Sequence, residues 1–428
     1  GSDLFGVDKK YRYLPLYSVS GLWRISQEPF MANAKWIDNL VVRASYGLQG
    51  NIDKNTSPFL LGNYRIENIL PGGSEDMIDV SGAPNKKLRW EKTHSVNAGF
   101  DFAVLNQAIN LSVDYYYRKG VDLIGTQMLP LETGFEMLTV NWASMQNQGV
   151  EVALSTRNIH TKNFMWTTNF NFAYNNNKIL KEALREDALE PGREGYPVGA
   201  LFALKTAGLD EEGYPMFEGK DGKAVSAMEF FKLQEWGFGA TDLTARERRE
   251  LYTYVGTADC PYTGGFNNTF TYKAFELGVN FSFDFGGKVR SQPTYSIVDF
   301  DKGRNTNRDI LNRWTPENTE TIFPVLLSQN ERLDEYMWYS NQNEIYRNLD
   351  IWIRDLNYVR LQNIRLGYTL PTNFSRKLGM TSATIAIEGR NLLVFGSSYK
   401  NYLDPETMSN AYATPAPKSV TLSLNLNF

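Results

Sequence analysis

Apolar and polar side chains alternate along much of this chain, and the alternation is clearest in its last ten residues, 419–428 (SVTLSLNLNF). One parity is polar and uncharged, and the other is wholly apolar: Val420, Leu422, Leu424, Leu426 and Phe428. Successive side chains of a strand point to opposite faces, so this pattern predicts a strand with one apolar and one polar face. A strand of a soluble sandwich has the same pattern. An aromatic residue that ends the apolar parity favours the closing strand of a membrane barrel, with lipid outside and water inside.

Ten other segments have the same two-residue period and are predicted as strands. They cover residues 14–26, 40–50, 94–104, 108–118, 147–157, 164–174, 264–273, 276–286, 357–370 and 380–393. The stretch 175–263 is less regular. We expect two weak strands there, at 198–208 and 213–219, and a charged helical piece near 226–251.

Short and long connections alternate between the predicted strands. The short ones are 27–39, 105–107, 158–163, 274–275 and 371–379, and the long ones are 51–93, 119–146, 175–263, 287–356 and 394–418. Transmembrane barrels show this asymmetry, with short periplasmic turns and long extracellular loops. A soluble sandwich has no reason to place every long loop at one end, and structureless loops of this length are unusual in compact domains.

Strand length supports the same interpretation. Ten residues at about 3.3 Å each and a tilt of about 45° rise roughly 24 Å, which matches an apolar band about 25 Å tall. Eleven strands, or thirteen with the weak pair, do not close the usual even-stranded bacterial barrel. The predicted fold is therefore all-β: the C-terminal part of a large antiparallel transmembrane β-barrel.

Composition narrows the function classes. Aromatic residues make up 14% of the 428 residues, which suits interface girdles. The net charge is −4, so composition gives no basic surface for nucleic acid. Cys260 is the one cysteine, which excludes a disulfide framework and a thiolate metal cluster. The sequence contains no apolar run of 18 residues, so a transmembrane helix is not expected.

Short motifs along the whole chain carry a family resemblance. They are 1–6 (GSDLFG), 23–31 (WRISQEPFM), 42–51 (VRASYGLQGN), 147–152 (NQGVEV), 261–270 (PYTGGFNNTF), 313–318 (RWTPEN), 358–371 (YVRLQNIRLGYTLP), 389–393 (GRNLL), 404–406 (DPE) and the terminal Phe428. In order and spacing they resemble the C-terminal half of the SusC/RagA family of TonB-linked (TonB-dependent) outer-membrane transporters of Bacteroidetes.

The resemblance implies a barrel of about 22 strands, a size class with a plugged lumen. Residues 1–428 would be its C-terminal portion; we expect the plug domain, the TonB-contacting segment, the signal peptide and the first strands before Gly1. The implied protein is not an enzyme. It is a multi-pass outer-membrane importer of oligosaccharides or oligopeptides in a Gram-negative, Bacteroidetes-like bacterium, surrounded by lipid and working with TonB and a SusD-like lipoprotein. Two alternatives stay open: a siderophore or cobalamin receptor of the wider TonB-dependent group, and a soluble β-rich carbohydrate-binding or hydrolase protein.

Candidate site residues follow from this interpretation. An aromatic cluster precedes and enters the strand at 357–370: Tyr336, Trp338, Tyr339, Tyr346, Trp352 and Tyr358. These rings serve either interface and loop packing or, except for Tyr358, stacking on a sugar or peptide at the outer mouth. The residues expected to line the lumen are Asn97, Asp101, Asn169, Asn171, Glu388 and Arg390.

The sequence predicts no catalytic residue, metal or cofactor. Asp299 and Asp301, with Gly303, lack the spacing of an EF-hand calcium loop. His94 and His160 lie in different predicted elements, which argues against a shared metal or catalytic site. Cys260 follows a loop without a partner and is interpreted as an incidental thiol.

Overall fold

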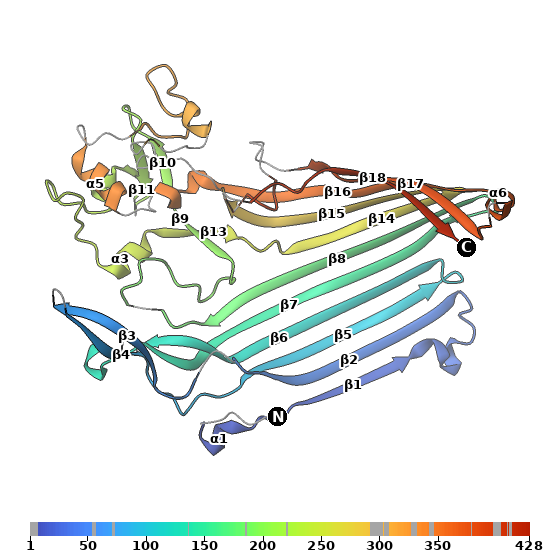
Figure 1. Ribbon diagram of the computed structural model, residues 1–428, viewed down its shortest axis with the longest axis horizontal. Helices are drawn as coiled ribbons and strands as arrows, with labels where there is room; N and C mark the ends of the chain where they lie inside the picture. The colour runs from blue at the N-terminus through green and yellow to red at the C-terminus, as the bar shows by residue number, and fades with distance from the viewer. Residues whose placement is uncertain are drawn as a thin grey trace. The chain divides into compact units, whose positions relative to one another are not determined.

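The computed structural model describes residues 7–53, 57–70, 73–135, 137–184, 186–219, 221–291, 303, 308–326, 332–341, 346–377, 379–396, 404–408, 410 and 413–428. The chain divides into two compact units. The first comprises Gly1–Asn158, Asn169–Arg185 and Gly192–Val198, and the second comprises Ile159–Thr168, Glu186–Pro191 and Gly199–Phe428. Long antiparallel strands dominate both (Figure 1).

In the first unit, sequential strands pair with one another. The long strands are β1 (Tyr17–Arg24), β2 (Ile37–Asn51), β5 (Glu91–Val104), β6 (Ile109–Met128), β7 (Met137–His160) and the greater part of β8 (Phe164–Lys181). The pairs β1–β2, β2–β5, β5–β6 and β6–β7 are all antiparallel. A separate hairpin, β3 (Leu61–Leu70) and β4 (Gly73–Gly82), lies in the connection from β2 to β5. The short helices are α1 (Lys9–Arg12), η1 (Ile25–Gln27), η2 (Pro29–Met31) and η3 (Leu131–Thr133).

In the second unit, five long strands follow one another in antiparallel order: β14 (Tyr262–Tyr272), β15 (Phe275–Arg290), β16 (Ile353–Thr369), β17 (Ser382–Phe395) and β18 (Ser419–Asn427). Its shorter strands are β9 (Ala200–Leu204), β10 (Thr206–Leu209), β11 (Pro215–Glu218), β12 (Ala224–Val225) and β13 (Tyr252–Thr257). Its helices are α2 (Ala227–Phe230), α3 (Ala245–Glu250), α5 (Leu333–Asn341), α6 (Thr372–Lys377), η4 (Arg308–Asn312), η5 (Tyr346–Asn348) and η6 (Asp350–Trp352).

Strand register keeps the apolar and the polar side chains on separate faces. Across β2, β5, β6 and β7 one row of partners reads Val42, Phe100, Val113 and Val152. The adjacent row reads Arg43, Gly99, Asp114 and Glu151. A slip of one residue in any pair would reverse the faces of that strand, so the apolar pattern itself fixes the register.

The apolar face of the second unit is exposed. On β18, Val420, Leu422 and Leu424 have 68%, 76% and 59% of their surface accessible, and they continue the row of Ile387 and Ile385 on β17. A contiguous exposed apolar surface of this kind marks contact with lipid or protein rather than water. The two-faced strands predicted from the sequence are therefore confirmed, and all eleven are present, with shifted ends.

Two predicted connections are partly strand. Residues 119–146 were expected to be a long loop, but β6 continues to Met128 and β7 begins at Met137. The register shifts around Leu123, and Asp122 has a φ of +58°, so the alternation loses its phase where the strand continues. The β3–β4 hairpin likewise occupies part of the expected loop 51–93.

The irregular stretch 175–263 contains less helix than expected. Only α2 and α3 form within 226–251, where each begins at a capping residue, Ser226 and Thr244. Between them, Lys232, Trp236 and Phe238 have positive φ angles, which interrupt a helix. The expected weak strands correspond to β9 with β10 and to β11.

These loop segments of the second unit share a hydrophobic core. It contains Leu204 of β9, Phe217 of β11, Phe231 directly after α2, Trp338 of α5 and Trp352 of η6, among others. Phe217 stacks on Phe230 with 4.7 Å between ring centroids. The connections are thus folded structure with a core of their own.

Candidate functional site

The polar face of the strands carries the charged groups, and in the first unit they meet around Arg43. Its guanidinium donates to Asp101 (2.9 Å) and Asp114 (2.6 Å), which lie on β5 and β6, and to the Ser112 hydroxyl (3.1 Å). Ser112 in turn donates to Asp101 over 2.7 Å. Each charged side chain is about one-third exposed, so the cluster is hydrated at one side. Two carboxylates share one guanidinium, which leaves a net negative charge.

The absence of a side chain at Gly99 leaves space for the Arg43–Asp114 ion pair. It lies between Arg43 and Asp114 in the cross-strand row, and a Cβ there would come within 2.3 Å of the Asp114 carboxylate. A side chain at this position would displace Asp114 from Arg43. Glycine in the middle of a strand therefore has a packing reason here.

A second charged cluster, in the second unit, has a buried ion pair, Arg360 with Asp404, at its centre. Arg360 on β16 has only 2% of its side chain exposed and donates to Asp404 and, over 2.8 Å, to Glu406. Tyr358 on the same strand donates its hydroxyl to Asp284 of β15 and to Glu406 (3.3 Å). The Asp404 carboxylate also accepts from the backbone N–H groups of Glu406 and Ala416. Segment 404–408, part of the connection from β17 to β18, is thereby anchored to the polar face of β16.

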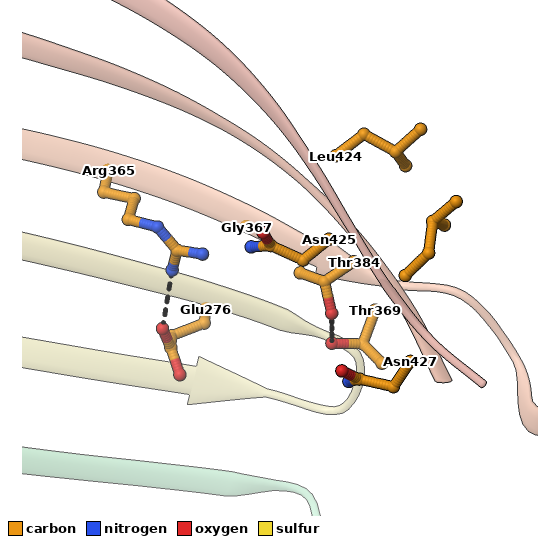
Figure 2. A pocket seen from close by; sticks show the side chains of 9 residues that line it. Glu276, Arg365, Gly367, Thr369, Thr384, Leu424, Asn425 and Asn427 are labelled. Carbon is orange, nitrogen blue, oxygen red and sulfur yellow. Dashed lines mark hydrogen bonds and ion pairs between the residues drawn. The ribbon is translucent and has the colours of Figure 1, made fainter. Parts of the chain in front are cut away.

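A polar concavity lies near the other end of the same strands (Figure 2). Its volume is about 720 Å³, and most of its lining is polar: Glu276, Arg365, Gly367, Thr369, Thr384, Leu424, Asn425, Leu426 and Asn427. Arg365 pairs with Glu276 over 2.9 Å, and the hydroxyls of Thr369 and Thr384 are 3.2 Å apart. Such groups hold water or bind a polar solute, and none of them is arranged as a nucleophile with its base.

A smaller cavity of about 490 Å³ lies beside Cys260 and is also lined by Asp284, Tyr358 and Glu406. Burial, together with the negative charge of Asp284, raises the pKa of the Cys260 thiol. The thiol is therefore protonated at neutral pH and unsuited to nucleophilic attack. This agrees with its interpretation as an incidental thiol.

The structure places the predicted lumen residues on their expected strands. Asp101 belongs to the Arg43 cluster, and Asn97 donates to Ser45 over 3.4 Å. Glu388 and Arg390 of β17 pair with each other over 2.5 Å. Asn169 and Asn171 are exposed on β8. Their role as lumen lining stays a prediction.

The aromatic cluster needs a correction. Trp338 is 2% and Trp352 0% exposed, and both belong to the hydrophobic core of the loop segments. Trp338 packs on Phe231 and Trp352 on Phe323, with centroids 5.2 and 5.6 Å apart. Neither ring has a face free for a sugar or peptide, so the packing interpretation holds for these two tryptophans.

The other aromatic rings divide differently. Tyr336 is partly buried against the same core, and Tyr358 belongs to the Arg360 cluster. The side chains of Tyr339 and Tyr346 lie outside the described residues. Stacking on cargo by Tyr336, Tyr339 or Tyr346 stays a prediction.

Metal ligation finds no support in the described part of the chain. No group of three or more His, Cys, Asp or Glu side chains there is close enough to hold an ion. Asp299 and Asp301 lie outside the described residues. His94 accepts or donates one hydrogen bond, to the Tyr46 hydroxyl at 2.9 Å. Among the described helices, none has the length and hydropathy to cross a membrane.

Sequence reasoning missed the arginines at the centre of both charged clusters. Arg43 meets Asp101 and Asp114 only through strand register, from 58 and 71 residues away. Arg360 stands on the polar parity of its strand, and its partners belong to the DPE motif. The Arg360 cluster could have been predicted from a charged residue on the polar face of a strand and an acidic motif in a nearby connection.

Comparison with known proteins agrees with this geometry. The family model described as "TonB dependent receptor-like, beta-barrel" matches residues 5–201. TonB-dependent receptor P3 of Formosa agariphila is 27% identical over 100% of this chain and 43% of its own length. TonB-dependent receptor SusC of Bacteroides thetaiotaomicron is 25% identical over 100% of this chain and 41% of its own length. The chain thus spans less than half the length of these relatives.

A solved structure shows the same fold. The RagAB peptide transporter superposes with a TM-score of 0.73 over 99% of this chain and 44% of that chain, at 23% identity. TonB-dependent receptors are a transporter family and not enzymes, in agreement with the prediction from sequence. Along its whole length the chain is thus homologous to TonB-dependent receptors such as SusC, and it has the fold of a portion of the outer-membrane β-barrel of such receptors of Bacteroidetes type.

Proposed function

We propose that the chain forms wall and outer loops of an energy-coupled importer for oligopeptides or oligosaccharides. The observation that carries the proposal is the separation of faces: an exposed apolar face for lipid, and an opposite face bearing hydrated and buried charge pairs. A polar face of this kind suits passage of a large hydrated solute. The likeness to a peptide transporter supports oligopeptides, and the family resemblance keeps oligosaccharides as the second class of cargo.

The proposed importer also contains the parts of its longer relatives that this chain does not match. These are a plug domain, the remaining strands and a segment that contacts TonB. Within the described residues, β1 and β18 each pair with one neighbour, β2 and β17. An unpaired strand edge is costly in lipid, so further strands have to close the wall.

A SusD-like surface lipoprotein is the proposed partner at the outer face. The support is the two-component complex named in the RagAB structure. In the proposed mechanism, cargo is captured between lipoprotein and outer loops, and TonB then draws the plug aside.

Uptake by cells tests the function. Cells expressing the complete receptor and its lipoprotein are given fluorescent oligopeptides and oligosaccharides above porin size, with and without TonB. We expect TonB-dependent uptake of one of these two classes. Uptake of a ferric siderophore or cobalamin, with neither oligomer entering, would contradict the proposal and favour the receptor alternative.

A further inference from the structure

Aromatic rings border the apolar face of β2 and its neighbours at two heights. At one end, the ring centroid of Tyr46 lies 6.1 Å from that of Tyr17 and 6.3 Å from that of His94. At the other end, Trp36 packs edge-on against Phe102 with 6.3 Å between centroids. From position 36 to position 46 the strand rises about 24 Å, at about 3.4 Å per residue and a tilt of about 45°. The two aromatic groups therefore mark the borders of the apolar band.

Beyond the Tyr46 border, two chain segments concentrate positive charge. Residues 8–12 and 85–92 contain seven cations and two carboxylates, a net charge of +5, in a chain whose net charge is −4. The Asp8 N–H donates to the Lys86 carbonyl over 3.1 Å, and the Trp90 indole N–H donates to the Arg12 carbonyl over 3.0 Å. The two segments thus lie side by side. Their cations are Lys9, Lys10, Arg12, Lys86, Lys87, Arg89 and Lys92.

These segments lie on the outward side of the strands. Gly50 stands on the apolar parity of β2, and a Cβ there would come within 2.8 Å of Leu14 and 2.9 Å of Trp90. Lys92 pairs with Gly50 and so shares its face. Lys119 of β6 lies diagonally beside Lys92 on the same face. We call residues 8–12 and 85–92, together with Lys119, the basic patch.

Most cations of the basic patch have no carboxylate partner. Arg89 and Lys92 share Asp122, over 2.6 and 2.9 Å. Within the described ranges of the chain, five lysines form no ion pair: Lys9, Lys10, Lys86, Lys87 and Lys119. All but Lys119 are exposed, and Lys119 is half-buried. Lysine can lay its stem on apolar surface and place its ammonium in a hydrated layer, where it attracts an anion.

Height and direction identify the anion. The long connection from β2 to β5 and helix α1 lie at this end of the strands, opposite the short turns (Figure 1), and long connections of transmembrane barrels are extracellular. The basic patch therefore stands outside the wall, just beyond the extracellular aromatic border, where lipid headgroups lie. Cargo in the lumen meets the opposite face. Phosphate is the anion that lipids present at this height, and lysine binds it as a point charge.

We propose that the basic patch binds phosphate groups of lipids in the outer leaflet of the outer membrane. The lysines hold these headgroups against the wall, and the attachment fixes the height of this part of the barrel in the membrane. The inference does not depend on the cargo of the importer.

Native mass spectrometry of the complete receptor in detergent measures the binding. The probes are phosphatidic acid, a lipid phosphate monoester, and phosphatidylcholine with the same acyl chains. We expect the wild type to prefer phosphatidic acid. The variant Lys86→Gln/Lys87→Gln/Lys119→Gln should bind it more weakly, on the order of tenfold or more. Heat-modifiable gel mobility verifies that the variant is folded.

A matched control removes the same charge elsewhere. Arg118 adjoins Lys119 on the opposite face of β6, and Lys35 and Lys162 are exposed in short connections at the other end of the strands. Arg118→Gln/Lys35→Gln/Lys162→Gln should therefore leave the affinity for phosphatidic acid nearly unchanged. An equal loss in both variants, or no preference for phosphatidic acid in the wild type, would overturn the inference.

Two competitors identify the source of the bound anion. Inorganic phosphate and a soluble oligogalacturonate are added at the concentration of the lipid. We expect neither to displace phosphatidic acid. Displacement by phosphate would show a site for the free ion, and displacement by the oligogalacturonate would show a site for acidic cargo; either result contradicts lipid binding.

Fluorescence quenching in nanodiscs tests the height without using affinity. In a Cys260→Ser background, a bimane label is attached at Lys119→Cys or, as the control, at Arg118→Cys. We expect phosphatidylcholine with a headgroup nitroxide to quench the label at position 119 more than lipid with a nitroxide deep in its acyl chain. The label at position 118 should respond to neither. A label at position 119 that neither lipid quenches would place the basic patch away from the membrane and refute the proposal.

Discussion

Removing Arg360 should release segment 404–408 from the strand that holds it. Arg360 is 2% and Asp404 7% exposed at the side chain, so Arg360→Met leaves the Asp404 carboxylate buried without its cation. Breaking a buried pair from one side costs about 3–5 kcal/mol. The cost falls on the local attachment, because Glu406 also loses its 2.8 Å contact with Arg360.

Hydrogen exchange measured by mass spectrometry on the complete receptor in nanodiscs reports this attachment. If about 3 kcal/mol of local stability is lost, amides of 404–408 exchange roughly a hundredfold faster. The N–H of Thr407, bonded to the Asp404 carbonyl at 2.9 Å, lies in the reporting peptide.

Two controls make the result specific. Arg365→Ala removes a pair with Glu276 that is 32% and 52% exposed, and such pairs contribute about 0–1 kcal/mol. Its effect on 404–408 should be negligible. The triple variant Arg360→Met/Asp404→Asn/Glu406→Gln removes the unpaired charges and should recover much of the protection. Unchanged exchange in Arg360→Met, or an equal effect of Arg365→Ala, would refute the reasoning.

Four further predictions concern the Arg43 cluster, the helix α3, to which two of them apply, and the loop core. Gly99→Val should push Asp114 from Arg43 and lower the temperature of the heat-modifiable gel shift, whereas Gly21→Ala, with no atom within 4 Å, should not; equal shifts would contradict the packing argument. Thr244→Ala should remove the cap of α3 at a cost of about 1 kcal/mol and speed its amide exchange about fivefold. Hydrogen bonds from Thr244, followed by Lys232, lower the pKa of Glu247 to about 2. The ionised carboxylate therefore stabilises α3 above pH 4.5, and this stabilisation is lost as the pH falls toward 2. Amide exchange in α3 that stays constant between pH 4.5 and pH 2 would contradict this prediction. Trp338→Ala should destabilise the loop core by about 3–5 kcal/mol, which limited proteolysis of the loops detects. Loops as resistant to protease as in the wild type would instead favour the alternative role of Trp338, stacking on cargo.

The strands were predictable because alternation is a local signal. The alternation of apolar and polar residues from Val420 to Phe428 predicts both faces of β18 without information from any other segment. Prediction failed where the phase breaks, as at Asp122 with its positive φ, beyond which β6 was taken for a loop. For Trp338 and Trp352 the sequence left packing and cargo stacking as alternatives, because burial of a loop residue depends on which distant segments fold over it. The charged clusters depend on register between strands, which no single window of sequence contains.

Strand β7 is longer than the apolar band of a membrane is tall, so only part of it has to exclude charged residues from its outward face. A strand of 24 residues tilted by about 45° rises about 56 Å, roughly twice the height of an apolar band about 25 Å tall. More than half of this strand therefore stands in the aqueous layer. Near the start of β7, the Lys181 ammonium lies 3.3 Å from the ring centroid of Trp142. Such a cation–π contact is suited to a hydrated surface. A lysine should be tolerated at outward positions near Trp142, whereas at Val152 it would meet the acyl chains.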